Sequence, residues 1–225
     1  MRFPFLGGAM AAALLASGPA LAQIPLYAQR LPDGTVYIRL VNALPGAASV
    51  QTDFAGKITL GAEDAARISP YFVAGQAGGK TVALQVDQGG ATATARFSPK
   101  SGAFVTVVLH PEGSGVAADI ITDKPEYNQL RARLSFYNAT ANCASGTLAE
   151  TGGRAIFTGI AADAAQARSI NPVAAKVTAS CATGHAPPLD LGKLEAGGLY
   201  SVWMMEPAGT LTAFVAHDTI APPQD

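Results

Sequence analysis

The stretch Arg39-Leu40-Val41-Asn42-Ala43 returns later in the chain as Arg133-Leu134-Ser135-Phe136-Tyr137-Asn138-Ala139. Two further blocks, an Ala-rich segment that ends in proline and a Gly-led apolar run, also occur twice in the same order: residues 64–70 and 163–172, then 102–109 and 198–205. The shifts between the copies are 96, 102 and 96 residues. Three blocks repeated in one order are typical of an internal duplication. The sequence therefore predicts two similar domains in tandem.

Short runs of alternating residues fill both copies. In the first copy Val82, Leu84 and Val86 alternate with Ala83 and Gln85, and glycine pairs and Pro-Asp-Gly steps interrupt such runs. This period-two pattern is what half-buried antiparallel strands need. We therefore expect an all-β protein with a β-sandwich-like domain in each copy.

Two Ala-rich stretches, residues 62–68 and 161–170, lack this alternation. We expect each of them to be a loop with at most one short helix.

The first residues have the features of a cleavable export signal. Arg2 supplies the charged end, a short apolar run follows, and Ala20-Leu21-Ala22 suits a signal peptidase. The apolar run is too short to cross a bilayer, so we expect a periplasmic protein without a transmembrane span. The expected division is a signal peptide at 1–22, an N-terminal β-sandwich domain at 23–123, a linker at 124–129, a C-terminal β-sandwich domain at 130–221 and a disordered tail at 222–225.

Cys143 and Cys181 are the only cysteines, and both lie in the second copy. An even number of cysteines in an exported protein favours one disulfide. Two free buried thiols, or half of a metal site, are the alternatives. No histidine lies near either cysteine with the spacing of a zinc site, so the disulfide is the preferred interpretation.

Composition and motifs argue against several classes of function. Charged residues make up 14% of the chain and the net charge is −1. The chain therefore has no excess of positive charge that would attract nucleic acid or an anionic membrane. His110, His185 and His217 are each expected at the surface or in a turn. No Gly-x-Ser-x-Gly elbow and no phosphate-binding loop occurs. We therefore expect no catalytic residue, cofactor or metal.

The remaining polar and aromatic residues leave room for a binding function. Most acidic residues, Asp123 among them, fall at turn signals, where capping or solvation explains them. Trp203 lies in an apolar strand and is expected in the core. Sugar rings stack on exposed aromatic side chains, and the candidates for exposure are Tyr27, Tyr71, Tyr127 and Tyr137.

Several of these stretches together resemble the alginate O-acetylation protein F family. The resemblance is carried by Leu26-Tyr27, by residues 34–43, by Arg168-Ser169-Ile170-Asn171-Pro172-Val173 and by the run 198–205. It implies a periplasmic accessory protein built of tandem β-sandwiches. Such proteins work beside a membrane-bound O-acyltransferase and SGNH-type acetyltransferases, which supply the chemistry. The chain departs from the family pattern in its cysteine pair and its Ala-rich loops, and similar proteins serve other polymers such as cellulose.

The family positions that match this chain are Tyr27, Arg39, Asn42, Arg168, Asn171 and Pro172. Either they shape turns and bond to carbonyls, or they contact a partner directly. The expected function is a non-catalytic adaptor that links the acyltransferase to the SGNH-type enzymes and is required for O-acetylation of alginate or a related exopolysaccharide, with the polymer itself a further candidate ligand. The alternatives are a general exported β-domain for surface adhesion or carbohydrate binding, and an esterase or acetyltransferase.

Overall fold

The computed structural model describes residues 32–222, and within them the protein is almost entirely β. The expected signal peptide, Tyr27 and the last three residues of the expected tail lie outside this range. No described helix is long and apolar enough to cross a bilayer. The all-β, sandwich-like fold predicted from the alternating runs is thus confirmed.

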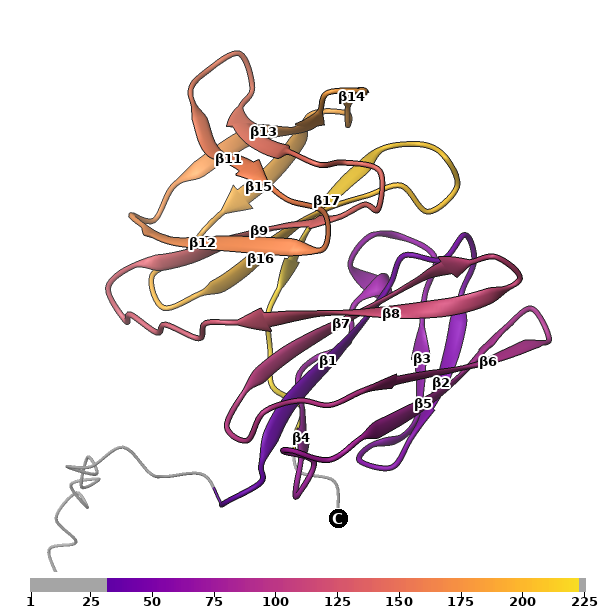
Figure 1. Cartoon of the computed structure of the whole chain (residues 1–225). Coiled ribbons are helices and arrows are strands. Elements are labelled where there is room, and N and C mark those ends of the chain that lie inside the picture. Colours follow the sequence, from indigo (N-terminus) through magenta and orange to yellow (C-terminus); the bar gives the residue numbers. More distant parts are fainter. Residues whose placement is uncertain (1–31, 223–225) are drawn as a thin grey trace, which may run out of the picture. The chain divides into compact units, whose positions relative to one another are not determined.

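The first sandwich consists of two four-stranded sheets (Figure 1). Its inner sheet has the order β4 (Phe72–Ala74), β1 (Val36–Asn42), β7 (Phe104–Glu112) and β8 (Gly115–Asp123). Its outer sheet has the order β3 (Gly56–Leu60), β2 (Ala48–Thr52), β5 (Val82–Gln88) and β6 (Ala91–Phe97). Only β1 and β7 pair in parallel within these two sheets. The short 3-10 helix η1 (Asp64–Arg67) connects β3 to β4.

The second sandwich repeats this arrangement. Its inner sheet has the order β12 (Ala164–Ile170), β9 (Ala132–Ala139), β16 (Leu199–Met205) and β17 (Thr212–His217). Its outer sheet contains β11 (Ala155–Ile160), β10 (Gly146–Glu150), β13 (Ala174–Cys181) and β14 (Gly184–His185), with β15 (Leu189–Lys193) also paired to β13. β9 and β16 form the parallel pair, in the place that β1 and β7 occupy in the first sandwich.

The expectation of a loop at residues 161–170 is wrong for most of that stretch. β12 pairs with β9 along its full length, from Ala164 opposite Asn138 to Ile170 opposite Ala132. It is an edge strand, and its small side chains hide the alternation that marks other strands. The stretch 62–68 does contain one short helix, η1, as expected.

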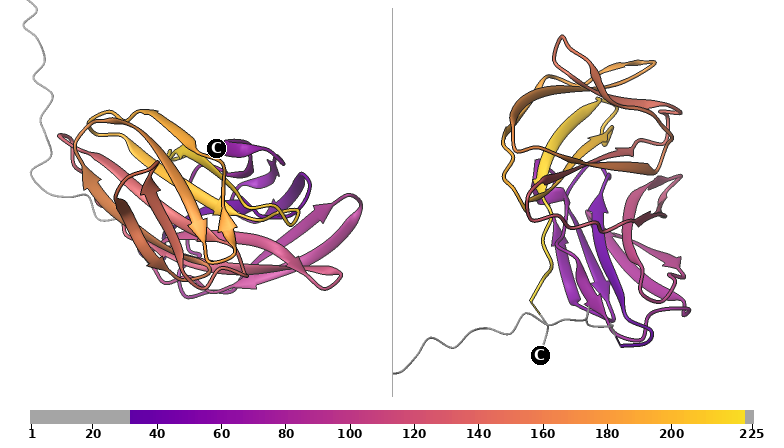
Figure 2. Two further views of the ribbon diagram at one scale, coloured as in Figure 1. Left: turned by 90° about the horizontal axis from the view of Figure 1, so that it is seen from above. Right: turned by 90° about the vertical axis from the view of Figure 1, so that its left-hand side faces the viewer.

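Three separate groups of buried side chains hold the described chain together. One fills the first sandwich and one fills the second. The third joins the inner sheets of both, with Val41 and Val108 from the first sandwich and Tyr137, Trp203 and Phe214 from the second. We call these packed faces the junction. Both sandwiches belong to one compact unit, and Figure 2 shows its strands from two further sides.

Burial on both faces explains the composition of the inner strands. In β1 the side chains of Ile38 and Leu40 enter the first core, whereas Val41 points into the junction. In β16 Val202 enters the second core and Trp203 the junction. Strands covered on both sides read as nearly continuous apolar runs, which is how these strands appear in the sequence.

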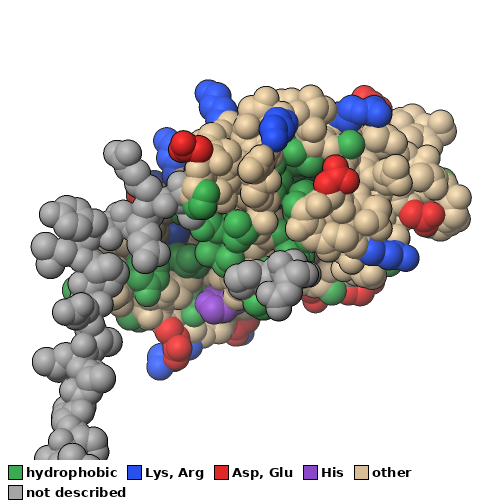
Figure 3. All heavy atoms as spheres, turned by 90° about the horizontal axis from the view of Figure 1, so that it is seen from below, with side chains coloured by type: hydrophobic (Ala, Val, Ile, Leu, Met, Phe, Trp, Pro, Cys, Tyr) green, Lys and Arg blue, Asp and Glu red, His purple; other side chains and the backbone are tan. Residues whose placement is uncertain are grey.

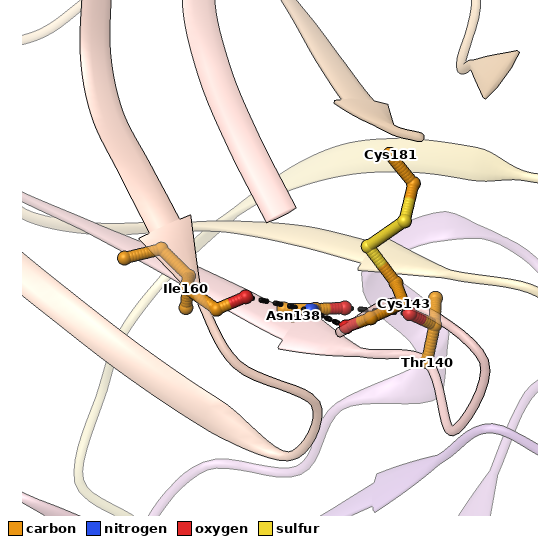
Figure 4. Close-up of a disulfide and its surroundings, with 5 residues drawn as sticks. All are labelled: Asn138, Thr140, Cys143, Ile160 and Cys181. Atoms are coloured by element: carbon orange, nitrogen blue, oxygen red, sulfur yellow. Dashed lines mark hydrogen bonds between the residues drawn. A yellow bond between two sulfur atoms is a disulfide. The ribbon is translucent and has the colours of Figure 1, made fainter. Parts of the chain in front are cut away.

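The predicted disulfide between Cys143 and Cys181 is present (Figure 4). It connects the loop after β9 to the end of β13, and the two Cα atoms are 5.8 Å apart. The bridge therefore ties the inner sheet of the second sandwich to its outer sheet.

Candidate functional site

Asn42 and Asn138 occupy equivalent positions and hold equivalent loops. The side-chain amide of Asn42 donates to the carbonyls of Gly46 at 2.8 Å and Gly61 at 2.7 Å. The amide of Asn138 donates to the carbonyls of Cys143 and Ile160 at 2.8 and 3.0 Å, as Figure 4 shows. Both asparagines are fully buried. The repeated motif therefore shapes turns, which is the structural interpretation of Asn42.

Arg39 lies at the centre of the junction with only 1% of its surface exposed. Its Nε donates to Thr106 Oγ1 at 2.8 Å, and one terminal nitrogen donates to the carboxylate of Asp218 at 2.7 Å. Three aromatic rings surround the guanidinium carbon, with centroids 4.5 Å away for Tyr71 and 4.9 Å away for Tyr137 and Trp203. Cation–π attraction of this kind strengthens where water is excluded.

The surroundings of Arg39 keep its guanidinium charged. Burial opposes the charge, but the nearby oxygens of Tyr137, Asp218, Tyr71 and Asp123 favour it, and the net effect raises the pKa of Arg39. The second terminal nitrogen, Nη2, has no hydrogen-bond partner within residues 32–222. The aromatic faces therefore provide much of the stabilisation on that side.

Asp123 accepts hydrogen bonds from three hydroxyl groups beside Arg39. Its carboxylate accepts hydrogen bonds from Tyr71 at 2.8 Å, Thr106 at 2.6 Å and Tyr137 at 2.6 Å. Burial raises the pKa of both tyrosines, so their hydroxyls stay protonated and donate. The expectation that Asp123 only caps a turn is therefore wrong.

Two of the four tyrosines that are candidates for exposure are buried. Tyr71 and Tyr137 are 7% and 3% exposed, because their rings pack against Arg39 and their hydroxyls bind Asp123. Trp203 is fully buried, as predicted, and stacks on Tyr137 with ring centroids 4.0 Å apart. Nothing local in the sequence marks these contacts, since the residues come from five different strands or connections.

A cleft of about 400 Å³ opens beside this cluster. Residues of both sandwiches and of the connection between them line it, among them Phe104, Tyr127, Arg133 and Ile220. Tyr127 is 66% exposed and Ile220 is 54% exposed. We call this feature the junction cleft. On another view of the molecule, Figure 3 shows hydrophobic side chains gathered near the middle of one face, with charged side chains mostly toward its margins.

The C-terminal segment closes one side of the junction cleft. After β17 the backbone of residues 219–221 pairs with Tyr71, whose N–H donates to the carbonyl of Thr219 at 2.8 Å. The N–H of Ala221 in turn donates to the carbonyl of Tyr71 at 2.8 Å. The end of the second sandwich is thereby fixed to the first.

The other described family positions, Arg168, Asn171 and Pro172, lie away from Arg39. Arg168 is exposed on β12 and places its guanidinium 5.4 Å from the ring centroid of Phe157. Asn171 and Pro172 are exposed in the turn between β12 and β13. None of the three lines the junction cleft. The structure thus separates Arg39 and Asn42 from the Arg168–Pro172 block.

One histidine differs from its expected setting. His185 and His217 are exposed, as predicted, but His110 is buried within β7 and bonds to Asp119. It lies on the face of β7 that points to the second sandwich, like Val108 two residues before it. The sequence signal for this burial is the apolar run before His110, since β7 continues through the following proline.

Comparisons with known proteins add little to this geometry. No protein-family model matches the sequence, and no curated protein matches it. Among solved structures, the chain is similar to a candidate cell adhesion protein from Bacteroides ovatus, with 11% identity over 86% of this chain and 100% of the other. The TM-score is 0.28, so this likeness carries no argument about function.

Proposed function

We propose that this protein is a non-catalytic periplasmic adaptor for O-acetylation of an exopolysaccharide, either alginate or a related polymer. In this proposal it links a membrane-bound O-acyltransferase to SGNH-type acetyltransferases. The sequence resemblance at residues 34–43 and 168–173 supports the pathway. The all-β fold in two similar sandwiches agrees with what that resemblance implies.

A binding role is best supported by the contrast between the paired polar groups of the junction and the exposed apolar cleft beside them. Arg39 bonds to Asp218, and Asp123 accepts from two tyrosines and a threonine. These side chains hold one sandwich against the other. Beside them, the junction cleft presents exposed apolar surface at Tyr127 and Ile220.

In the proposed mechanism, the protein acts by binding its partner proteins and holding them together. A partner segment inserts apolar side chains into the junction cleft and packs against Tyr127, because exposed aromatic residues beside a cleft are typical anchors of protein interfaces. Holding the acetyl donor and the transferase on one rigid body raises their effective concentration without any bond being made. Arg133 and Glu126, paired at 3.5 Å on the rim, add polar contacts.

Co-purification tests this proposal directly. Tagged wild-type protein, expressed in the source bacterium, is expected to retain the acyltransferase or an SGNH-type enzyme. Tyr127→Ala is expected to lose most of that material. Leu130→Ala is the matched control, because Leu130 is 83% exposed near Tyr127 but does not line the cleft. Retention of no acetylation component by the wild type would contradict the proposal.

The junction cleft also favours a second candidate, direct carbohydrate binding. Tyr127 offers an exposed ring, and Asp123 and Asp218 place carboxylates in the same cleft. Sugars bind such sites by stacking and by hydrogen bonds to their hydroxyls. Titration of the purified protein with alginate oligosaccharides, monitored by tyrosine and tryptophan fluorescence, distinguishes the adaptor role from the carbohydrate-binding role. Saturable sugar binding that Tyr127→Ala abolishes, with no retained protein partner, favours the carbohydrate-binding role.

A further inference from the structure

A second polar cluster, formed by His110, Asp119 and Asp163, lies at the junction. His110 belongs to β7, four residues beyond Thr106 on the same face of the strand. Its Nε2 is hydrogen-bonded to a carboxylate oxygen of Asp119, on β8. Its Nδ1 lies 4.0 Å from Oδ1 of Asp163, in the turn that leads into β12. The cluster thus combines one imidazole with carboxylates from both sandwiches.

Strand register and turn geometry fix these three side chains. In the β7–β8 pair, His110 lies opposite Ala117 and Asp119 lies opposite Val108. His110 and Asp119 are therefore diagonal neighbours on one face, within reach of each other. Asp163 has a φ of 50°, a left-handed conformation that aspartate tolerates better than most residues.

The hydrogen bond to Asp119 determines what the other ring nitrogen offers. When neutral His110 donates its Nε2–H to Asp119, the lone pair of Nδ1 points away from that bond. Oδ1 of Asp163 is buried and has no hydrogen-bond partner in the described part of the chain. Two acceptors then face each other, an arrangement that a cation between them would stabilise. Burial raises the pKa of Asp163, as expected for a carboxylate that lacks such a partner.

We propose that His110 Nδ1 and the Asp163 carboxylate bind a divalent transition-metal ion, with Zn²⁺ as the best match. Asp119 then serves as the outer carboxylate that orients the imidazole, a pattern common at zinc-bound histidines. One ligand atom from each of the three residues lies within 4.8 Å of the others. Tetrahedral zinc, with bonds of about 2.0–2.2 Å, requires the two inner ligand atoms to approach by less than about 1 Å.

A neighbouring pocket adjoins the cluster at His110, the one member of the three that lines it. It has a volume of about 230 Å³ and is lined by His110, Thr140 and Glu206 among others. Water molecules in this pocket would complete the coordination of the ion. Nitrogen and oxygen ligands together suit zinc and its neighbours better than calcium or magnesium. This proposal departs from the expectation of no metal, because the cluster forms from residues far from both cysteines in the sequence.

The bound ion would fasten β7 and β8 to the turn before β12. It would therefore stabilise contact between the sandwiches at a place distinct from Arg39. The proposal does not depend on the acetylation role, since its test measures metal binding and folding stability.

Zinc titration of the purified protein after EDTA treatment tests this inference. Isothermal titration calorimetry is expected to show one Zn²⁺ per wild-type chain. Thermal denaturation followed by circular dichroism is expected to show a higher unfolding temperature for the zinc-bound protein than for the zinc-free protein. Asp163→Asn is expected to weaken zinc binding at least about 10-fold, and Asp119→Asn about 10- to 100-fold. Asp64→Asn is the matched control, because Asp64 holds the same repeat position with a positive φ but is exposed.

Two results would overturn the proposal. The first is a wild-type protein without saturable zinc binding. The second is zinc binding by Asp163→Asn with wild-type affinity. Far-UV circular dichroism establishes that each variant is folded. Because Asp119 is half exposed, Asp119→Asn keeps the test decisive even if Asp163→Asn does not fold.

Discussion

Arg39 and Asp218, which are 179 residues apart in the chain, meet across the junction in a 2.7 Å hydrogen-bonded ion pair. Asp218 also accepts a hydrogen bond from Ser201 at 2.6 Å, and Ser201 accepts one from the indole N–H of Trp203 at 2.8 Å. β1 of the first sandwich is thus connected to β16 of the second and to Asp218, the residue that follows β17. These hydrogen bonds therefore join the inner sheets of the two sandwiches.

Replacing Arg39 should destabilise the protein strongly. Arg39→Ala leaves Asp218 partly buried without its partner and removes the cation from three aromatic rings, so we expect a loss of about 3–5 kcal/mol in the free energy of unfolding. Urea denaturation measures this loss. Arg96→Ala is the control, because Arg96 is exposed on the outer sheet. Equal stability of the two variants would contradict the role assigned to Arg39.

The shared core predicts cooperative unfolding of both sandwiches. Trp203 is the only tryptophan in the chain and is fully buried at the junction, so its fluorescence reports on that interface. We expect the denaturation midpoint from Trp203 fluorescence to coincide with that from far-UV circular dichroism, as two-state unfolding requires. If the fluorescence changed at clearly lower denaturant, the junction would separate before the sandwiches unfold.

Loss of the disulfide should lower stability without changing the fold. The bridge spans 38 residues, and the chain-entropy account gives about 4 kcal/mol for a loop of that length. We expect the double variant Cys143→Ala/Cys181→Ala to unfold at lower urea than the oxidised wild type. Reduced wild-type protein is the control and should behave like the double variant. A difference below about 1 kcal/mol would show that the bridge contributes little.

Asp163 should give the metal-free protein a defined pH dependence. Burial raises its pKa above the ordinary value of 3.8, so the folded state binds this proton more tightly than the unfolded state. The resulting stability is present below 3.8 and is lost as the pH rises through the raised pKa. In EDTA, we therefore expect wild type to lose stability relative to Asp163→Asn over that range. A difference that stays constant with pH would contradict this account.

The fold class was accessible from sequence because local patterns encode it. Alternation in strands such as β5, glycines at turns and the repeated Arg39–Ala43 stretch all act over short distances. The cysteine pair was also predictable, since only one pairing exists. The sequence does not predict β12, because its alanines show no contrast between the two faces of this edge strand.

The candidate site was largely hidden in the sequence because long-range packing creates it. Asp123 and Tyr71 are 52 residues apart and neither has a local motif, yet they share a hydrogen bond. The apolar runs in β7 and β16 did contain a signal. Runs with too few polar positions for a half-exposed sheet indicate burial on both faces, and hence a junction between the inner sheets. The family resemblance points to Arg39, but no local pattern around it predicts its burial.

The acetyl content of the exopolysaccharide tests the proposed function most directly. It is measured as acetyl groups per sugar residue in polymer from a strain lacking this gene, with and without a plasmid copy. We predict that the deletion strain makes polymer with little or no acetyl, that the wild-type gene restores it, that Leu130→Ala restores it and that Tyr127→Ala does not. Unchanged acetylation in the deletion strain would contradict the adaptor function.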